Sequence, residues 1–171
     1  NLPLDVYTML PSCVPATPFE TSGFDLNSYD LSLLIDKPWV LGLAEMMNFP
    51  GVLNQDNNVM AKLELAKSRG KCIDGHAPYL HGKDLCAYIA SGVKSDHECT
   101  TPDEAVEKLR LGMYVMVREG TAAKDLDALM PVLKTCNTRK CIFVTDDRHP
   151  ADLKEHINGM VRRAVEAGVD P

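Results

Sequence analysis

Six short apolar runs alternate with longer amphipathic stretches, and this alternation is the feature that most constrains the fold. The runs cover residues 6–10, 40–44, 71–74, 92–94, 114–117 and 141–144. They are too short for most helices and several are rich in Val and Ile, which is typical of buried parallel strands. The stretches between them predict helices over residues 28–35, 57–68, 84–90, 102–112, 122–133 and 150–167. A strand followed by a helix, repeated along the chain, predicts an α/β fold with a parallel sheet.

The length and charge of the chain narrow the class of protein. A chain of 171 residues without a low-complexity linker predicts one domain over residues 1–171. There are 18 Lys and Arg against 24 Asp and Glu, a net charge of −6, and the cations form no basic stripe. Nucleic acid and anionic membrane are therefore not expected as partners. No apolar run approaches the roughly 20 residues that span a bilayer.

The cysteines indicate a reducing compartment rather than a metal cluster. All six occur singly, without a C-x-x-C pair, at positions 13, 72, 86, 99, 136 and 141. In a chain that is large enough to bury a core, such cysteines are read as reduced thiols. We therefore expect a cytoplasmic protein, and we do not expect a zinc site made of cysteines.

Polar side chains collect where four of the predicted strands end. Glu45, His76, His97 and Asp146 each follow an apolar run, or come within a few residues of its end. Because parallel strands open their carboxyl ends on one face, these groups can converge despite their separation in sequence. Carboxylates and imidazoles suit Zn, Mn or Fe in a hydrolytic site, and a carboxylate beside such a metal can accept a proton from water. Four such groups at four strand ends indicate a metal-dependent hydrolase, although each residue alone is more often structural.

Other polar residues have plainer interpretations. Asp147 or His149 could cap the last predicted helix, which would also contain His156. His81 and His156 are both interpreted as surface residues. A cysteine nucleophile would require Cys99 to work with nearby His97, but Cys99 follows the predicted strand end on the wrong side. No G-x-S-x-G segment supports a serine nucleophile.

Four segments together resemble the bacterial adenine deaminases of the amidohydrolase superfamily. They are LGLAEMMNFPGV, DGHAPYLHGKDLCAYIASGVKSDHE, MYVMVREG and FVTDDRHP, and they occur in the order and at the spacing of that family. The resemblance implies a (β/α)8 barrel and the hydrolytic deamination of adenine to hypoxanthine and ammonia, in purine salvage. It also implies a small-molecule substrate and a homo-oligomer. The cytidine-deaminase class is excluded, because its H-x-E and P-C-x-x-C motifs are absent.

The resemblance also implies which residues hold the metals. Glu45, after the fourth strand of the barrel, matches a carboxylate that bridges two divalent metals. His76 and His97 match the imidazoles that follow the fifth and sixth strands. Asp146 matches the eighth-strand metal ligand and proton shuttle, and Asp147 is its fallback. Mn or Fe is the metal we expect, with Zn as an alternative, in a binuclear centre of the complete enzyme.

Two further residues are implied near the substrate. Glu98, beside His97, is a candidate for protonating or holding a purine ring nitrogen. Arg118, just past the seventh strand, is a candidate for orienting the substrate, although a salt bridge at the barrel rim explains it equally well. The predicted catalytic set is therefore Asp146, His97 and Glu98.

One departure from the family is large. The first-strand H-x-H pair of the family occurs nowhere in this chain, and a complete barrel needs about 250 residues. The chain therefore resembles strands three to eight of a barrel without the small β domain, cut from a longer chain. Such a piece would expose two sheet edges, so we expect self-association or an altered sheet that closes these edges. We also expect the piece to be a poor enzyme alone.

Three alternatives remain open. The chain could belong to an amidohydrolase acting on another nucleobase or a cyclic amide. It could be an inactive piece that works only through association. A flavodoxin-like binding domain would share the alternation, but no glycine-rich phosphate loop follows any predicted strand.

Overall fold

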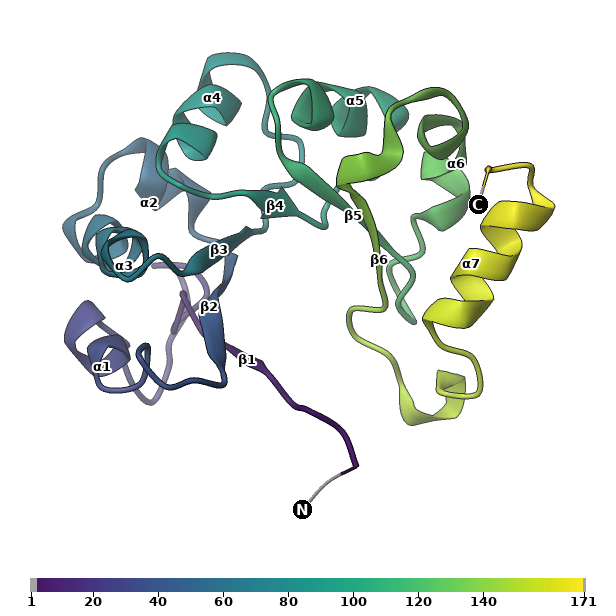
Figure 1. Cartoon of the computed structure of the whole chain (residues 1–171). Helices are drawn as coiled ribbons and strands as arrows, with labels where there is room; N and C mark the ends of the chain where they lie inside the picture. The colour runs from purple at the N-terminus through teal and green to yellow at the C-terminus, as the bar shows by residue number, and fades with distance from the viewer. Residues whose placement is uncertain (1–2, 171) are drawn as a thin grey trace. The chain divides into compact units, whose positions relative to one another are not determined.

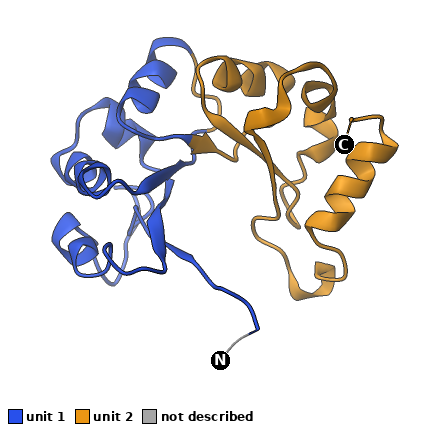
Figure 2. Ribbon diagram, viewed as in Figure 1, with its two compact units in different colours: residues 1–77, 82–94 blue, residues 78–81, 95–171 orange. Residues whose placement is uncertain are grey.

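Six parallel strands form two three-stranded sheets in the computed structural model, which describes residues 3–170 (Figure 1). The first sheet has the order β1-β2-β3, with β1 Thr8–Leu10, β2 Val40–Met46 and β3 Cys72–Gly75. The second has the order β4-β5-β6, with β4 Ser95–Asp96, β5 Tyr114–Arg118 and β6 Cys141–Val144. Every pairing within these sheets is parallel, which confirms the α/β class. The contacts divide the chain into two units, which Figure 2 colours separately.

Unit 1 comprises residues 1–77 and 82–94 and contains the first sheet. Its helices are α1 Ser28–Ser32, α2 Phe49–Leu53, α3 Asn57–Ser68 and α4 Gly82–Ala90. Leu43 and Ile73 on the strands and Leu63 and Leu85 on the helices are fully buried in its core. Gly42 is required where β2 meets β3, because a Cβ there would lie 1.9 Å from the carbonyl oxygen of Cys72.

Unit 2 comprises residues 78–81 and 95–171 and contains the second sheet. Its helices are α5 Pro102–Arg110, α6 Leu126–Thr135 and α7 Ile157–Glu166, with short 3-10 turns at Thr138–Lys140 and Pro150–Asp152. Val115 and Val117 of β5 pack in one buried cluster with Leu126 and Leu129 of α6 and Met160 of α7. The single domain expected over residues 1–171 stays a prediction.

Local sequence signals explain where the best predicted helices begin and end. The Asp56 carboxylate accepts hydrogen bonds from the Asn58 and Val59 amides at 3.0 Å and caps α3. Gly70, with φ of +63°, follows the end of that helix in a conformation that glycine adopts without strain. Thr101 caps α5, whose first residue is Pro102. The predicted bounds of α3 are confirmed, and α5 differs only at its end.

Several predicted bounds were wrong. The strand placed at residues 92–94 is Ser95–Asp96, because Gly92 turns the chain after α4 with φ of +112°. The helix predicted from residue 122 begins at Leu126, since the segment before it folds back and Lys124 bridges Glu119. The helix expected over residues 28–35 is only Ser28–Ser32, and the short helix α2 was not predicted.

The helix predicted over residues 150–167 is interrupted. Only a 3-10 turn forms at Pro150–Asp152, and α7 starts at Ile157. The Arg148 guanidinium donates hydrogen bonds to the carbonyls of Glu119 and Glu155, which fixes the segment between the two helical pieces as a loop. None of the described helices combines the length and the apolar character needed to span a membrane.

Candidate functional site

In unit 1, the ends of β2 and β3 bring together Glu45 and His76. Oε2 of Glu45 lies 2.8 Å from Nδ1 of His76, a hydrogen bond between residues 31 positions apart. Glu45 lies inside strand β2, one residue before its end, rather than after it, whereas His76 directly follows β3 as predicted. Their side chains are 39% and 28% exposed, so both remain accessible to solvent.

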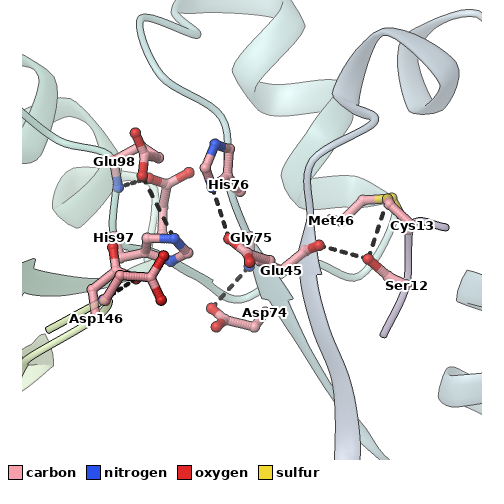
Figure 3. A network of polar contacts seen from close by, with 12 residues as sticks. Ser12, Cys13, Glu45, Met46, Asp74, Gly75, His76, His97, Glu98 and Asp146 are labelled. Atoms are coloured by element: carbon pink, nitrogen blue, oxygen red, sulfur yellow. Dashed lines mark hydrogen bonds and ion pairs between the residues drawn. The ribbon is translucent and has the colours of Figure 1, made fainter. Parts of the chain in front are cut away.

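Ser12 and Tyr88, which the sequence analysis did not select, form hydrogen bonds to the backbone at this pair. The Ser12 hydroxyl donates to the Glu45 carbonyl at 2.6 Å (Figure 3). The Tyr88 hydroxyl donates to the Met46 carbonyl at 2.8 Å and accepts from the His76 amide at 3.2 Å. Tyr88 is fully buried, so its hydroxyl joins the ends of β2 and β3 inside the core. Its position on the buried face of α4, three residues after Leu85, was the available signal.

In unit 2, the ends of β4 and β6 bring together His97, Glu98 and Asp146. Each offers a ligand atom, and these atoms all lie within 4.8 Å of one another. Figure 3 shows the three side chains as neighbours. His97 directly follows β4, and Asp146 lies two residues past β6. One imidazole and two carboxylates form a donor set that suits a divalent Zn, Mn or Fe ion.

Asp146 occupies an unusual backbone conformation. Its φ of +51° lies in the left-handed region, which costs a residue other than glycine about 1–3 kcal/mol, less for Asp and Asn than for most. Its Oδ1 accepts a hydrogen bond from the Asp147 amide at 2.8 Å. The extended chain that follows β6 therefore ends at Asp146, the residue predicted to act as the proton shuttle.

Arg118, the last residue of β5, is the centre of an ion-pair network in unit 2. Its Nε donates to Asp125 at 3.0 Å, and its Nη1 donates to Asp146 at 3.2 Å and also to Glu98. The side chain is only 9% exposed. Burial opposes its charge, but Glu98, Asp125 and Asp146 together raise the pKa of Arg118. The salt-bridge interpretation of Arg118 therefore has direct geometric support, and its contact with the substrate stays a prediction.

Asp125 was missed by the sequence analysis, although it anchors this network. It precedes α6 and is buried, with 8% exposure. Its amide donates to the Arg118 carbonyl at 3.0 Å. Arg118 and Asp125 are therefore joined by one hydrogen bond between their backbones and one between their side chains. The only sequence signal was an acidic residue at the start of a predicted helix, which is common without any function.

The plainer interpretations can also be compared with the structure. His149 caps the 3-10 turn at Pro150, accepting from the Ala151 amide at 3.2 Å. Asp147 is exposed, and its described contacts are made by its backbone. His81 is exposed and pairs with Glu107 at 2.8 Å, as expected of a surface residue. His156 is exposed, but it stands at the N-cap of α7 and not inside the helix.

The cysteine alternative has no support in the geometry. Cys99 is 1% exposed, and burial raises the pKa of its thiol to about 12. A thiol with this pKa holds almost no thiolate near neutral pH, and the thiolate is the nucleophilic form. Cys99 is therefore a core residue of unit 2, and no disulfide occurs among the described cysteines.

The chain is similar to known proteins along nearly its whole length. Residues 1–169 match the model of the Amidohydrolase family. Over 99% of its length the chain is 53% identical to an adenine deaminase of Desulfatibacillum aliphaticivorans and 55% identical to adenine deaminase 2 of Carboxydothermus hydrogenoformans. It is 54% identical to an adenine deaminase of Nitratidesulfovibrio vulgaris. The chain spans 30% of the length of each of these relatives.

The family match also bears on the fold. Amidohydrolases are built on a TIM barrel, and two parallel sheets of three strands agree with the six barrel strands predicted from the sequence. A match over residues 1–169 covers nearly the whole chain, far beyond the few motifs that first indicated the resemblance. The chain belongs to the amidohydrolase family.

Proposed function

We propose that the complete protein deaminates adenine hydrolytically to hypoxanthine and ammonia, with this chain supplying most of the metal ligands and the proton-transfer groups. The observation that carries the proposal is the cluster of His97, Glu98 and Asp146 at the strand ends of unit 2, in a chain whose relatives carry the name adenine deaminase. The substrate rests on those names, and the hydrolytic chemistry rests on the donor set.

The metal ligands are assigned from the strand ends. Each of Glu45, His76, His97 and Asp146 would serve as a ligand of divalent metal, as the family resemblance implies. A bound divalent metal lowers the pKa of water, so that hydroxide is available at neutral pH. We expect Mn or Fe, with Zn as the alternative, because this set contains only imidazole and carboxylate.

The residues of the chain then move the protons. Asp146 accepts the proton of the attacking water and delivers it to the departing amino group, while the water oxygen bonds to the ring carbon that carried that group. Glu98 protonates or holds a ring nitrogen, which makes the ring carbon more electrophilic. Arg118 orients both carboxylates through its Nη1, and Asp125 fixes Arg118. Water adds and ammonia leaves, so adenine plus water gives hypoxanthine plus ammonia.

This function sets the expected context of the protein. Adenine deamination belongs to purine salvage, and we propose a cytoplasmic homo-oligomer that takes a small-molecule substrate. Neither nucleic acid nor membrane is a proposed partner, in keeping with the net charge of −6 and the absence of a basic stripe.

The test is ammonia release from adenine by the complete protein loaded with Mn²⁺ or Fe²⁺. We expect turnover, and we expect Asp146→Asn to lower kcat by about 1,000-fold or more, as losing a catalytic acid–base group does. Asp147→Asn is the matched comparison one residue away. Loss in Asp147→Asn alone would transfer the role to the fallback residue, and full rates in both variants would refute the proton shuttle.

A second variant tests the metal role separately from turnover. Glu45→Gln keeps the shape of the side chain but removes its charge, so we expect less bound metal by elemental analysis. Unchanged metal content would contradict the bridging role. If adenine is inert while another nucleobase releases ammonia, or a cyclic amide is opened by hydrolysis, the substrate is wrong and the metal chemistry remains.

A further inference from the structure

The cluster in unit 2 contains a geometric problem, because His97 and Glu98 are consecutive. Successive side chains of a β-strand point to opposite faces, so neighbours on an extended backbone cannot serve one site. Nevertheless, a ligand atom of each lies within 4.8 Å of the other and of Asp146. The extended backbone of β4 must therefore end between Asp96 and Glu98, and some contact must hold it in that bend.

The bend is held by the side chain of Asp96. Its Oδ1 accepts a hydrogen bond from the backbone amide of Glu98 at 2.7 Å, which closes a turn from residue i to residue i+2. Asp96 is fully buried, so this carboxylate does not belong to the solvent-facing cluster. A buried carboxylate needs a cation or several donors to remain there.

The cation is Lys108 of α5, which is itself 0% exposed. Its Nζ lies 3.3 Å from Oδ1 of Asp96 and 2.7 Å from Oε1 of Glu104, one helical turn earlier. Glu104 also accepts from the backbone amides of Tyr79 at 3.0 Å and Thr100 at 3.4 Å. The triad of Asp96, Lys108 and Glu104 therefore fixes the chain before β4 and after it, as well as the turn between His97 and Glu98.

We propose that Lys108 is a positioning residue of the active site, which acts through the Asp96 turn to aim His97 and Glu98 at the same metal and substrate. This inference rests on the proposed function for the meaning of the site, but the turn and the triad are geometric. Lys108 is too deeply buried to touch substrate, so it acts on His97 and Glu98 through the groups that it contacts, among which Asp96 holds the turn. Disturbing the turn should lower metal affinity and kcat together, because it moves His97 and Glu98 at the same time.

Two variants of Asp96 separate the turn from general stability. Asp96→Asn keeps an oxygen that accepts the Glu98 amide, whereas Asp96→Ala removes that acceptor. In the complete protein we expect Asp96→Ala to lose about 10- to 100-fold in Mn²⁺ affinity and in kcat, as supporting residues of metal sites do, and Asp96→Asn to recover most of the loss. Equal losses in the two variants, or wild-type values in a folded Asp96→Ala variant, would overturn the proposal.

Lys108→Met tests the cation, with Lys134→Met as its control, because Lys134 is exposed on α6 of the same unit. We expect the folded Lys108→Met protein to bind Mn²⁺ at least tenfold more weakly, and the control to match wild type. Wild-type Mn²⁺ affinity and kcat in folded Lys108→Met would refute the role. If Lys108→Met does not fold, the comparison of Asp96→Ala with Asp96→Asn decides whether the turn positions His97 and Glu98.

The same measurements distinguish failure of this inference from failure of the proposed function. If the wild-type protein releases no ammonia from adenine, the proposed function fails. The Mn²⁺ affinities of the two Asp96 variants still decide whether the turn positions His97 and Glu98.

Discussion

Each unit buries one lysine on a helix, and the two lysines are held in opposite ways. Lys62 of α3 in unit 1 is 4% exposed, and its Nζ donates to the Ser12 carbonyl at 3.0 Å. Lys108 of α5 in unit 2 is 0% exposed and contacts two carboxylates. Burial is the largest influence on both, yet the pKa of Lys62 is lowered and that of Lys108 is raised.

The difference comes from what faces each ammonium group. Around Lys62 the acidic groups that favour its charge, such as Asp25 and Asp56, are too weak to offset desolvation. Around Lys108, Asp96 and Glu104 more than offset it. The comparison shows that burial alone makes a lysine a weak base, whereas burial among carboxylates makes it a fixed structural cation. Only the second kind can hold a neighbouring carboxylate in a chosen place.

The largest expected difference is in stability. Lys108→Met leaves two carboxylates buried without their cation, which should cost about 3–5 kcal/mol of unfolding free energy. Lys62→Met loses one hydrogen bond to a carbonyl but also removes a poorly solvated amine, so we expect a change within about 1 kcal/mol. Urea titration of the complete protein measures both variants. Similar losses for the two lysines would show that their environments differ less than their contacts indicate.

The pH dependence sharpens the same comparison. Lys62 has a lowered folded pKa, so between that pKa and 10.5 the unfolded state binds more protons, and its contribution to stability rises with pH. Lys108 has a raised pKa, so its contribution is complete below 10.5 and is lost only as the pH rises further, through that pKa. The stability of wild type relative to Lys62→Met should therefore increase between pH 9 and pH 10.5, by at most about 1.4 kcal/mol per pH unit.

Over the same interval, the stability of wild type relative to Lys108→Met should stay flat. Denaturant titrations at several pH values measure the two differences. Two parallel curves would contradict the assignment of opposite pKa directions to the two lysines.

The sequence predicted the strands of both units better than it predicted the burial of these two lysines. Apolar runs located five of the six strands, because parallel strands buried on both faces are continuously hydrophobic. Strand β4 was misplaced because it consists of Ser95 and Asp96, which no apolar pattern detects. The burial of the Asp96 carboxylate depends on Lys108, which lies 12 residues further along the chain.

The candidate site shows the same limit. Residue type and position at strand ends were sufficient to select Glu45, His76, His97 and Asp146. The supporting contacts of Arg118, with partners 7 to 28 residues away, depend on tertiary structure that no local pattern contains. One signal for Lys108 was available. In α5, residues 104, 105 and 108 lie on one face at helical spacing, and charged residues on the buried face of a helix indicate an internal ion pair.

The smallest expected effect concerns the caps of the two helices that carry the lysines. Asp56 caps α3 with two hydrogen bonds of 3.0 Å, whereas Thr101 caps α5 with one of 3.4 Å. We expect Asp56→Ala to cost about 1 kcal/mol and Thr101→Ala about half as much, with Asp56→Asn and Thr101→Ser as controls that keep an acceptor. Thermal unfolding of the complete protein measures all four variants.

These caps also differ in what else they do. Asp56 is one of the charges that raise the pKa of Lys62, so Asp56→Ala should lower that pKa further, and Asp56→Asn should do the same while restoring the cap. Thr101 carries no charge, so its loss should leave the pKa of Lys108 unchanged. A larger loss for Thr101→Ala than for Asp56→Ala would contradict the ranking of the two caps by the number and length of their hydrogen bonds.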